Sequence, residues 1–368
     1  MNEELPDRPV KGRGAVSNRT GRFEGTVRVR VDDGWSLPPP PDGGDEDGSE
    51  LPPLRTRVLE DAARSIITRN DSPDIPFDLS INPYRGCEHG CVYCFARPSH
   101  AYLGLSPGLD FETMLFRKAE APALLERELR AKGYVCQPIA LGANTDPYQP
   151  IEREQKLTRR ILEVCRDYKQ PVGIITKSSL VVRDLDILAP MAAEGLASVA
   201  ISVTTLDRDL ARRMEPRAST PTKRLEAIRA LTKAGVTVAV LSSPMIPGLN
   251  DHEMEAILEA AAGMGATRAS YILLRLPLEI AGLMEEWLRT HAPDRAERVM
   301  SLVRQCRDGA VYNAEWGTRM KGTGPYAEML RARFKLATRR LGLDPRRWDL
   351  DCGKFRPPPR PGDQLALL

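Results

Sequence analysis

Three cysteines lie within eight residues of one another, in the stretch Cys87-Glu88-His89-Gly90-Cys91-Val92-Tyr93-Cys94. Spacings of four and three residues let the three thiolates converge on one side of a compact loop. Three thiolates leave a structural zinc site one protein ligand short. They suit three irons of a cubane cluster, whose fourth iron stays open to an outside chelator. The triplet therefore predicts a [4Fe-4S] cluster on Cys87, Cys91 and Cys94.

A zinc site is the alternative for the same residues. His89, His100 or a remote cysteine could complete a Cys3His set, and the chain would then be a non-enzymatic zinc module that binds nucleic acid. The seven cysteines are odd in number and are not spaced like a secreted disulfide framework. In a reducing compartment, a tight group of thiols indicates a metal site. No second group has comparable spacing, so we expect one cluster.

The triplet follows the first of six short apolar runs that alternate with helical patterns, which is typical of parallel α/β folds. Six strand–helix units are too few for a closed eight-stranded barrel and predict a partial one. Functional sites of such folds assemble in the loops after the carboxyl ends of the strands, where the triplet stands. The expected strands are 79–83, 139–143, 172–176, 198–203, 237–241 and 270–274.

The chain is expected to have three parts. Residues 1–55 are a low-complexity, disordered segment rich in Pro, Gly and acidic residues, with one short possible strand from Thr26 to Val31. Residues 56–285 form the barrel and residues 286–368 a mainly helical, basic extension. There is no run of eighteen apolar residues and no signal-like start, so we expect a cytoplasmic protein without membrane contact.

The charge of the chain is unevenly distributed. Residues 319–360 contain twelve Lys and Arg against four Asp and Glu, a local charge of +8, so the rest carries −5 of the formal net +3. A basic region on an acidic body suggests a polyanionic partner, of which nucleic acid is the usual one. A solvated helix face in an arginine-rich protein is the other explanation.

The cysteine triplet resembles the signature of the radical S-adenosylmethionine (SAM) superfamily, including the aromatic residue before the last cysteine, Tyr93. The resemblance covers about residues 79–277 and implies a partial (βα)6 barrel of the TIM type. It also implies that the amino and carboxylate groups of SAM bind the open iron. The cluster would pass an electron to SAM, and the resulting 5′-deoxyadenosyl radical would abstract hydrogen from a substrate. A one-electron donor such as flavodoxin or ferredoxin is expected.

The resemblance places SAM contacts at the strand ends. Asn144, Thr145 and Asp146 follow the second strand where the superfamily often has Gly-Gly-Glu-Pro, and Asp146 offers a carboxylate to the SAM ammonium. Lys177 follows the third strand and could pair with the SAM carboxylate. A simple turn and a surface lysine are the alternatives. The other candidate SAM contacts are Tyr93, Ser202, Thr204 and Arg217, the last in a stretch to Arg224 that could anchor a loop or the SAM carboxylate.

Within the superfamily, residues 82–152 resemble the spore photolyase-like group, often described as DNA repair photolyases. The resemblance is carried by Asn82-Pro83-Tyr84-Arg85-Gly86-Cys87, Cys91-Val92-Tyr93-Cys94 and Thr145-Asp146-Pro147-Tyr148-Gln149-Pro150. The name of the group implies repair of a thymine lesion by abstraction and return of hydrogen. A substrate that is a nucleic acid or a nucleotide is the first hypothesis, and the basic C-terminal region supports it. Radical modification of a peptide or metabolite is the alternative, and in that case the basic C-terminal region is incidental.

Spore photolyase uses a further cysteine near its substrate to return a hydrogen atom, so a fourth thiol is expected at the site. Cys136 precedes the second strand, at the wrong end of the barrel. Cys165 and Cys306 lie on apolar helix stripes, which indicates buried structural roles. Cys352 lies in irregular sequence and is the remaining candidate for the catalytic hydrogen donor.

Overall fold

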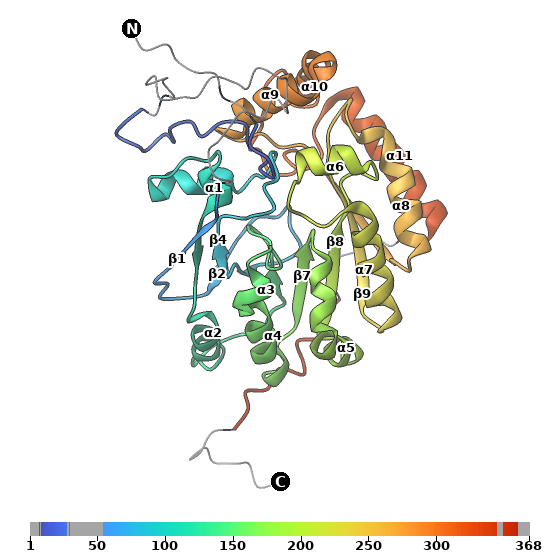
Figure 1. Cartoon of the computed structure of the whole chain (residues 1–368). Helices are drawn as coiled ribbons and strands as arrows, with labels where there is room; N and C mark the ends of the chain where they lie inside the picture. The colour runs from blue at the N-terminus through green and yellow to red at the C-terminus, as the bar shows by residue number, and fades with distance from the viewer. Residues whose placement is uncertain (1–6, 8, 28, 30–53, 344–348, 360–368) are drawn as a thin grey trace, which may run out of the picture.

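A seven-stranded sheet forms the centre of the computed structural model, which describes residues 7, 9–27, 29, 54–343 and 349–359 (Figure 1). The strand order is β10-β9-β8-β7-β6-β3-β2, with every neighbouring pair parallel except β2 with β3. The six parallel strands confirm the predicted partial barrel. The strands are β2 (Ile67–Arg69), β3 (Leu79–Ile81), β6 (Ile139–Leu141), β7 (Val172–Thr176), β8 (Ala197–Ser202), β9 (Thr237–Met245) and β10 (Arg268–Leu273).

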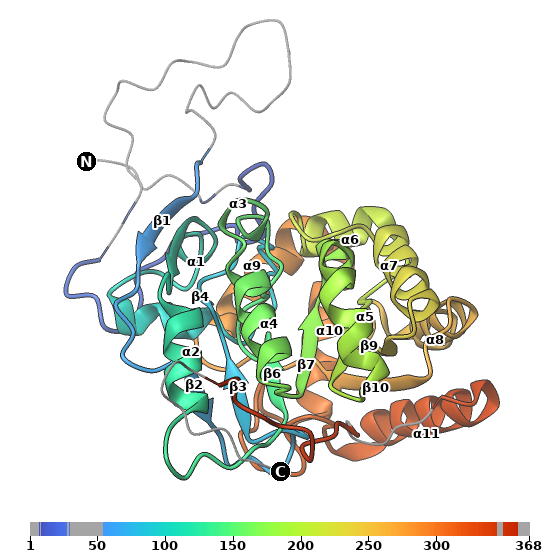
Figure 2. The same ribbon diagram turned by 90° about the horizontal axis from the view of Figure 1, so that it is seen from below.

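Helices cover the outer face of this sheet, as the view from below shows (Figure 2). In α4, Leu157, Ile161 and Val164 are buried at helical spacing, so its apolar stripe faces the strands. Thr220 caps α7 by accepting a hydrogen bond from the amide of Lys223. The outer helices are α2 (Ala121–Leu129), α4 (Leu157–Asp167), α5 (Leu185–Ala193), α7 (Pro221–Lys233), α8 (Met254–Gly263) and α11 (Gly324–Leu341).

Shorter elements lie in the connections and shape the end of the barrel where the strands finish. They are the helices α1 (Asp110–Thr113), α3 (Glu152–Gln155) and α6 (Arg208–Met214), and the 3-10 helices η1 (Arg97–Leu103), η2 (Ser179–Asp184) and η3 (Asp251–Glu253). All six residues of β8 are buried, because side chains fill the inside of the sheet while helices cover the outside. Full burial of a Val, Leu or Ile side chain contributes roughly 1.5–3 kcal/mol.

A second, three-stranded sheet braces the segment that follows β3. Its order is β1-β5-β4, with β1 parallel and β4 antiparallel to β5. Because β4 is only two residues long and immediately precedes the cysteine loop, its pairing with β5 fixes where that loop starts. The strands are β1 (Arg57–Glu60), β4 (Tyr84–Arg85) and β5 (Met114–Arg117).

The N-terminal segment differs from its prediction. Residues 13–17 are buried, and the amides of Gly14 and Ala15 each donate a 2.9 Å hydrogen bond to the carboxylate of Glu112. The expectation that residues 1–55 are disordered is wrong for this stretch, because a buried carboxylate holds its backbone. Thr26, Val27 and Val29 form no strand, and the rest of the predicted strand lies outside the described residues.

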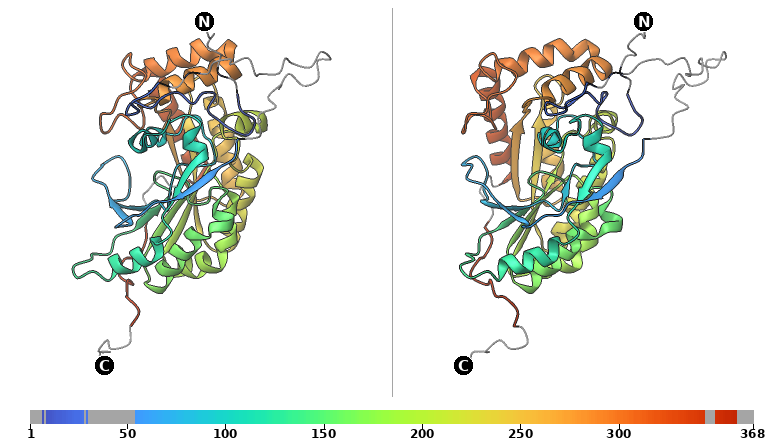
Figure 3. Two further views of the ribbon diagram at one scale, coloured as in Figure 1. Left: turned by 60° about the vertical axis from the view of Figure 1, so that its left-hand side comes forward. Right: turned by 90° about the vertical axis from the view of Figure 1, so that its left-hand side faces the viewer.

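The C-terminal part is helical, as predicted, but it is not separate from the barrel. Helix α9 (Ile280–His291) begins before residue 286, and α10 (Pro293–Gln305) follows it. The blue N-terminal segment runs beside these helices (Figure 3), where Arg19 pairs with Glu286 at 2.8 Å. Helix α11 packs on α8, and Arg333 pairs with Glu255 at 2.5 Å.

Salt bridges to α8 therefore neutralise part of the positive charge of α11. Arg340 likewise pairs with Glu259 of α8. The basic C-terminal region consequently offers less free charge to a polyanion than its composition indicates. No helix in the described part of the chain is both long and apolar enough to cross a membrane.

Candidate active site

Cys87, Cys91 and Cys94 share the loop between β4 and η1, at the carboxyl end of the barrel strands. Cys87 and Cys91 are buried and Cys94 is half-buried. Burial is the main cause that raises the pKa of all three thiols, and the charges of Cys91 and Cys94 raise that of Cys87 further. Lys177 acts in the opposite direction on Cys91 and Cys94. Three mutually interacting thiols thus occupy a site where ionisation requires a positive partner.

A buried arginine holds the backbone of this loop. The guanidinium of Arg97 donates to the carbonyl oxygens of Cys91 (2.8 Å) and Gly90 (3.1 Å) and pairs with Glu112 at 2.5 Å. Gly90 has a φ of +67°, and a Cβ atom there would lie 2.7 Å from a carboxylate oxygen of Glu112. The loop therefore requires glycine at this position, both for its backbone conformation and for the space.

A buried carboxylate lies beneath the loop. Glu215 follows α6 and accepts hydrogen bonds from the hydroxyls of Tyr93 and Thr204, the latter at 2.6 Å. Arg224 of α7 pairs with the same carboxylate, and the Nζ of Lys177 lies 3.6 Å from its Oε1. The hydroxyl of Tyr93 therefore points into this polar network rather than toward solvent. The network ties the cysteine loop to four further segments of the barrel.

Asp146 forms a second polar centre beside the loop. Its carboxylate accepts hydrogen bonds from the Thr176 hydroxyl (2.6 Å), the Lys177 amide (2.7 Å) and the Tyr148 amide (2.9 Å). The Nδ1 atom of His89, between the first two cysteines, lies 3.3 Å from its Oδ2. Burial alone would raise the pKa of Asp146, but His89 and these donors bring it below its ordinary value. Asp146 is therefore an ionised carboxylate that fixes the loop to the end of β7.

The candidates after β6 adjoin the start of the cysteine loop. The side-chain oxygen of Asn82 accepts from the amides of Asn144 (2.9 Å) and Thr145 (3.3 Å). The hydroxyl of Thr145 donates to the carbonyl of Tyr84 at 2.9 Å, so its hydrogen already has an acceptor within the protein. Asn144 is exposed, which leaves its side chain open to a ligand.

Arg217 and Ser202 complete the set. Arg217 pairs with Glu88 at 3.1 Å, and its amide donates to the carbonyl of His89 at 3.3 Å. Ser202 is buried at the end of β8, and its carbonyl accepts from Arg224 at 3.0 Å. The structure thus gathers all the predicted SAM contacts around the cysteine loop: Tyr93, Asn144, Thr145, Asp146, Lys177, Ser202, Thr204 and Arg217.

Cys352 is not part of this site, and the expectation that it reaches the cluster is wrong. The amide of Asp351 donates to the carbonyl of Gly195, which lies before the amino end of β8. The Cys352 thiol interacts with that of Cys136, before the amino end of β6; burial and this neighbour raise the pKa of Cys136 to about 12. The C-terminal segment crosses the end of the sheet opposite the cysteine loop (Figure 1). Cys165 and Cys306 are fully buried, as expected.

The histidines proposed for a zinc site are already engaged. His100 shares a 2.9 Å hydrogen bond with the carbonyl of Met114, and His89 contacts Asp146. Across the residues with a described position, no three His, Cys, Asp or Glu side chains are grouped to hold a single metal ion. The two histidines could complete a Cys3His set only by giving up these partners.

Two of the buried charges that shape the loop, Arg97 and Glu112, were not predicted. The local sequence does not mark Glu112 as buried, because it stands in a short stretch of mixed polarity, Asp110-Phe111-Glu112-Thr113-Met114. Their pairing across a long loop is visible only in three dimensions. The position of Arg97, three residues after the cysteine triplet, is a feature that could have prompted a search for its partner.

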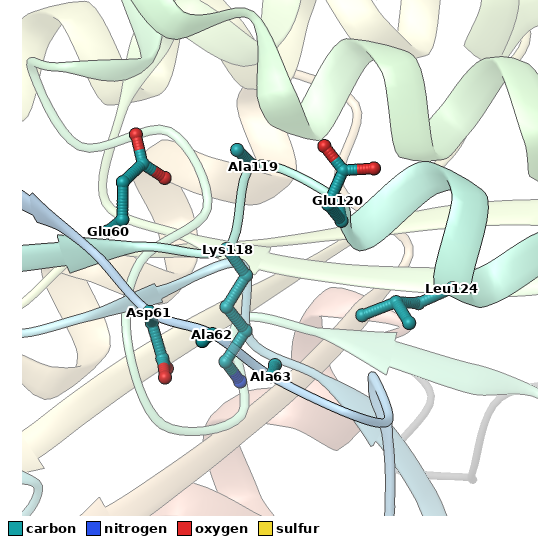
Figure 4. Close-up of a pocket in the computed structure, with 8 residues that line it drawn as sticks. All are labelled: Glu60, Asp61, Ala62, Ala63, Lys118, Ala119, Glu120 and Leu124. Atoms are coloured by element: carbon teal, nitrogen blue, oxygen red, sulfur yellow. The ribbon is translucent and has the colours of Figure 1, made fainter.

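A pocket of about 340 Å³ lies away from the cysteine loop, where β1 and β5 end and α2 begins (Figure 4). Lys118 reaches across it toward Asp61, and burial lowers the pKa of this lysine. None of the predicted site residues contributes to it. It is lined by Glu60, Asp61, Ala62, Ala63, Lys118, Ala119, Glu120 and Leu124.

Comparison with known proteins relates the barrel to one family. A family model described as the radical SAM superfamily matches residues 81–261. A Mycobacterium tuberculosis protein described as uncharacterized is 37% identical over 233 residues, 63% of this chain and 68% of that protein. A Methanocaldococcus jannaschii protein, also described as uncharacterized, is 30% identical over 173 residues, 47% of this chain and 62% of that protein.

Solved structures show the same fold at low sequence identity. Spore photoproduct lyase complexed with dinucleoside spore photoproduct superposes with a TM-score of 0.56 at 15% identity, covering 78% of this chain and 80% of that one. A mutant of that lyase with bound AdoMet and dinucleoside spore photoproduct gives a TM-score of 0.55 at 15% identity, with the same coverage.

Proposed function

The chain belongs to the radical SAM superfamily and is a radical SAM enzyme, and we propose that Cys87, Cys91 and Cys94 hold its [4Fe-4S] cluster. The observation that carries this proposal is the set of three buried or half-buried thiols on one loop at the carboxyl end of the barrel. When bound, the cluster supplies the electron that cleaves SAM to methionine and a 5′-deoxyadenosyl radical, which abstracts hydrogen from the substrate.

The donor set fits such a cluster. Three protein thiolates leave one iron for SAM, and Lys177 supplies a nearby positive charge that favours the ionised thiolates. Burial excludes water from Cys87 and Cys91, which protects both the cluster and a reactive radical. Gly90 and Arg97 fix the backbone between the ligands.

Lys177 is the residue we assign to the SAM carboxylate. Burial lowers the pKa of its amine to about 8, so it is largely charged at neutral pH and has little water to compete with a ligand. Asn144 offers an exposed amide to the SAM amino acid group or ribose. Because Asp146 already has four partners, we assign it to positioning the Lys177 backbone and His89 rather than to direct contact with SAM.

We propose a nucleic acid or nucleotide as substrate. The solved structures that share the fold include a lyase bound to a dinucleoside photoproduct, although this likeness supports the fold alone. Modification of a peptide or metabolite is the second candidate, favoured by the internal neutralisation of α11 through Arg333–Glu255 and Arg340–Glu259. Flavodoxin or ferredoxin is the class of electron donor we propose.

Iron analysis tests the cluster assignment. The protein is reconstituted anaerobically with iron and sulfide, and iron per chain is counted in the wild type and in Cys87→Ser, Cys91→Ser and Cys94→Ser. We expect about four irons per wild-type chain and a substantial loss in each variant. One zinc per chain, or unchanged iron in the variants, would contradict the assignment.

A further inference from the structure

Arg275, beside the cysteine loop, has no acidic partner among the described residues. It follows β10, and its Nη2 donates to the hydroxyl of Tyr312 at 3.2 Å, while Nη1 lies 3.5 Å from the sulfur of Met320. Among the residues that the structure describes, its buried Nε has no hydrogen-bond partner and no carboxylate pairs with the side chain. A buried donor without a partner is unfavourable, so this site suits an acceptor that the described residues do not supply.

A second cation lies beside Arg275. Arg307 is 2% exposed, and among the described residues its side chain donates to backbone carbonyls alone, including that of Leu274, the neighbour of Arg275, at 2.9 Å. Burial lowers the pKa of Arg307, and the charge of Arg275 lowers it further. Among the described residues neither of these two cations meets a carboxylate, so together they create a positive potential that favours an anion.

An aromatic ring extends this cationic site to the cysteine loop. Phe95 immediately follows Cys94, is 46% exposed, and its ring centre lies 5.4 Å from the guanidinium carbon of Arg275. Exposed aromatic rings beside cations are surfaces on which nucleobases stack. The ring centre of Tyr312 lies 5.8 Å from the same carbon, so a second ring adjoins the guanidinium.

The segment that supplies Tyr312 and Met320 is fixed in place. The amide of Leu273 donates to the carbonyl of Met320 at 2.9 Å, so this segment continues the edge of β10. Further along it, the amide of Gly317 and the side chain of Arg319 both donate to Asp74, in the connection between β2 and β3. The segment therefore spans from one edge strand of the open barrel to the other, which keeps the cationic site preorganised.

We propose that Arg275 and Phe95, with Tyr312, bind a nucleoside phosphate, with its base on Phe95 and its phosphate on Arg275. This inference rests on the proposed function, because it places a nucleotide substrate next to the loop that holds the cluster. The nucleotide is either free or part of a strand, since both present the same base and phosphate.

Calorimetry on the anaerobically reconstituted holoprotein tests the site with thymidine and thymidine 5′-monophosphate as probes. We expect the monophosphate to bind at least about tenfold more tightly than thymidine, since hydrogen bonds to charged groups contribute about 1.5–3 kcal/mol. Arg275→Gln should abolish that difference, and Arg275→Lys should retain part of it. Phe95→Leu should weaken both ligands. Arg340→Gln, which removes an exposed arginine of α11, is the charge-matched control and should change neither.

An oligonucleotide separates the two sources of the nucleotide. Tighter binding of octathymidylate that is still lost in Arg275→Gln supports the site and assigns it to a strand. If octathymidylate binds with the same affinity as the monophosphate, and this binding also depends on Arg275, the result supports a site for a free nucleotide. No preference for the phosphate, or equal effects of Arg275→Gln and Arg340→Gln, would overturn the inference.

The same samples are assayed for 5′-deoxyadenosine after addition of SAM and dithionite. Cleavage of SAM without nucleotide binding would overturn this inference and leave the proposed function intact. Nucleotide binding by a protein that holds no iron and never cleaves SAM would overturn the proposed function instead.

Discussion

The Nζ atom of Lys177 lies 3.6 Å from Oε1 of Glu215, which joins the end of β7 to the end of α6 directly beneath the cysteine loop. The same amine donates to the carbonyl of Ser243 in β9 at 3.3 Å and lies 5.7 Å from the ring centre of Tyr93. One lysine at the end of β7 therefore lies close to two further segments of the barrel and to the cysteine loop. The positive charge of Lys177 therefore acts on the thiols of Cys91 and Cys94. It would also attract a carboxylate that enters the site.

Replacement of this lysine tests its assignment to SAM. Lys177→Gln should raise the dissociation constant of the reconstituted protein for SAM by about 10- to 100-fold, because it removes a charged hydrogen-bond donor from a buried site. Equilibrium dialysis with labelled SAM measures the change. Lys169→Gln, which removes a half-exposed lysine paired with Glu194, is the control. Equal affinities in all three proteins would refute the assignment.

Glu215→Gln should destabilise the protein by about 3–5 kcal/mol, because Arg224 would be left as a buried charge without its partner. Urea unfolding measures the loss. The matched substitution Glu259→Gln, at the exposed pair with Arg340, should cost less than about 1 kcal/mol. Similar losses in the two variants would show that the Glu215 network does not stabilise the site.

Gly14→Ala should displace the buried N-terminal stretch from the cysteine loop, since a Cβ atom there would lie 1.7 Å from the carbonyl oxygen of Gly90. Hydrogen–deuterium exchange should show faster exchange of the Ala15 amide, which donates to Glu112 in the wild type. Gly25→Ala has nothing within 4 Å of the new atom and should leave exchange unchanged. Wild-type protection in Gly14→Ala would contradict this packing.

The buried Lys321 should make stability depend on pH. Burial lowers the pKa of its amine from 10.5 to about 8, so between these values the unfolded chain binds more protons than the folded one. Its contribution to stability therefore rises as the pH increases from about 8 toward 10, and its cost is fully present below pH 8. Urea unfolding at pH 7.5 and 9.5 should show a smaller rise in Lys321→Met than in the wild type. An identical rise would mean that the amine titrates normally.

Local pattern was sufficient to predict the strands and to single out the cysteine loop. Runs such as Val172–Thr176 are apolar, bounded by turns and separated by helical repeats, so both their existence and their order follow from the sequence. The triplet of Cys87, Cys91 and Cys94 is local as well, since its members are only seven residues apart.

The features that the sequence does not predict depend on contacts between segments that lie far apart in the chain. The N-terminal segment contains few apolar residues and was expected to be disordered, yet Glu112, 98 positions beyond Gly14, fixes its backbone. The sequence around Cys352 has no regular pattern from which its position relative to the strands could be inferred. In the structure, the amide of Asp351 donates to the carbonyl of Gly195, which holds Cys352 at the end of the strands opposite the cysteine loop. Such contacts depend on where segments meet after folding, and no periodicity encodes them.

Formation of 5′-deoxyadenosine tests the central claim most directly. The reconstituted protein is incubated with SAM and dithionite beside the triple variant Cys87→Ala, Cys91→Ala, Cys94→Ala and the control Cys136→Ser, Cys352→Ser, whose thiols lie at the opposite end of the barrel. The account predicts the nucleoside from the wild type and the control and none from the triple variant. Nucleoside formation that survives loss of the three cysteines, or a fully iron-loaded wild type that forms none with several reductants and candidate substrates, would contradict it.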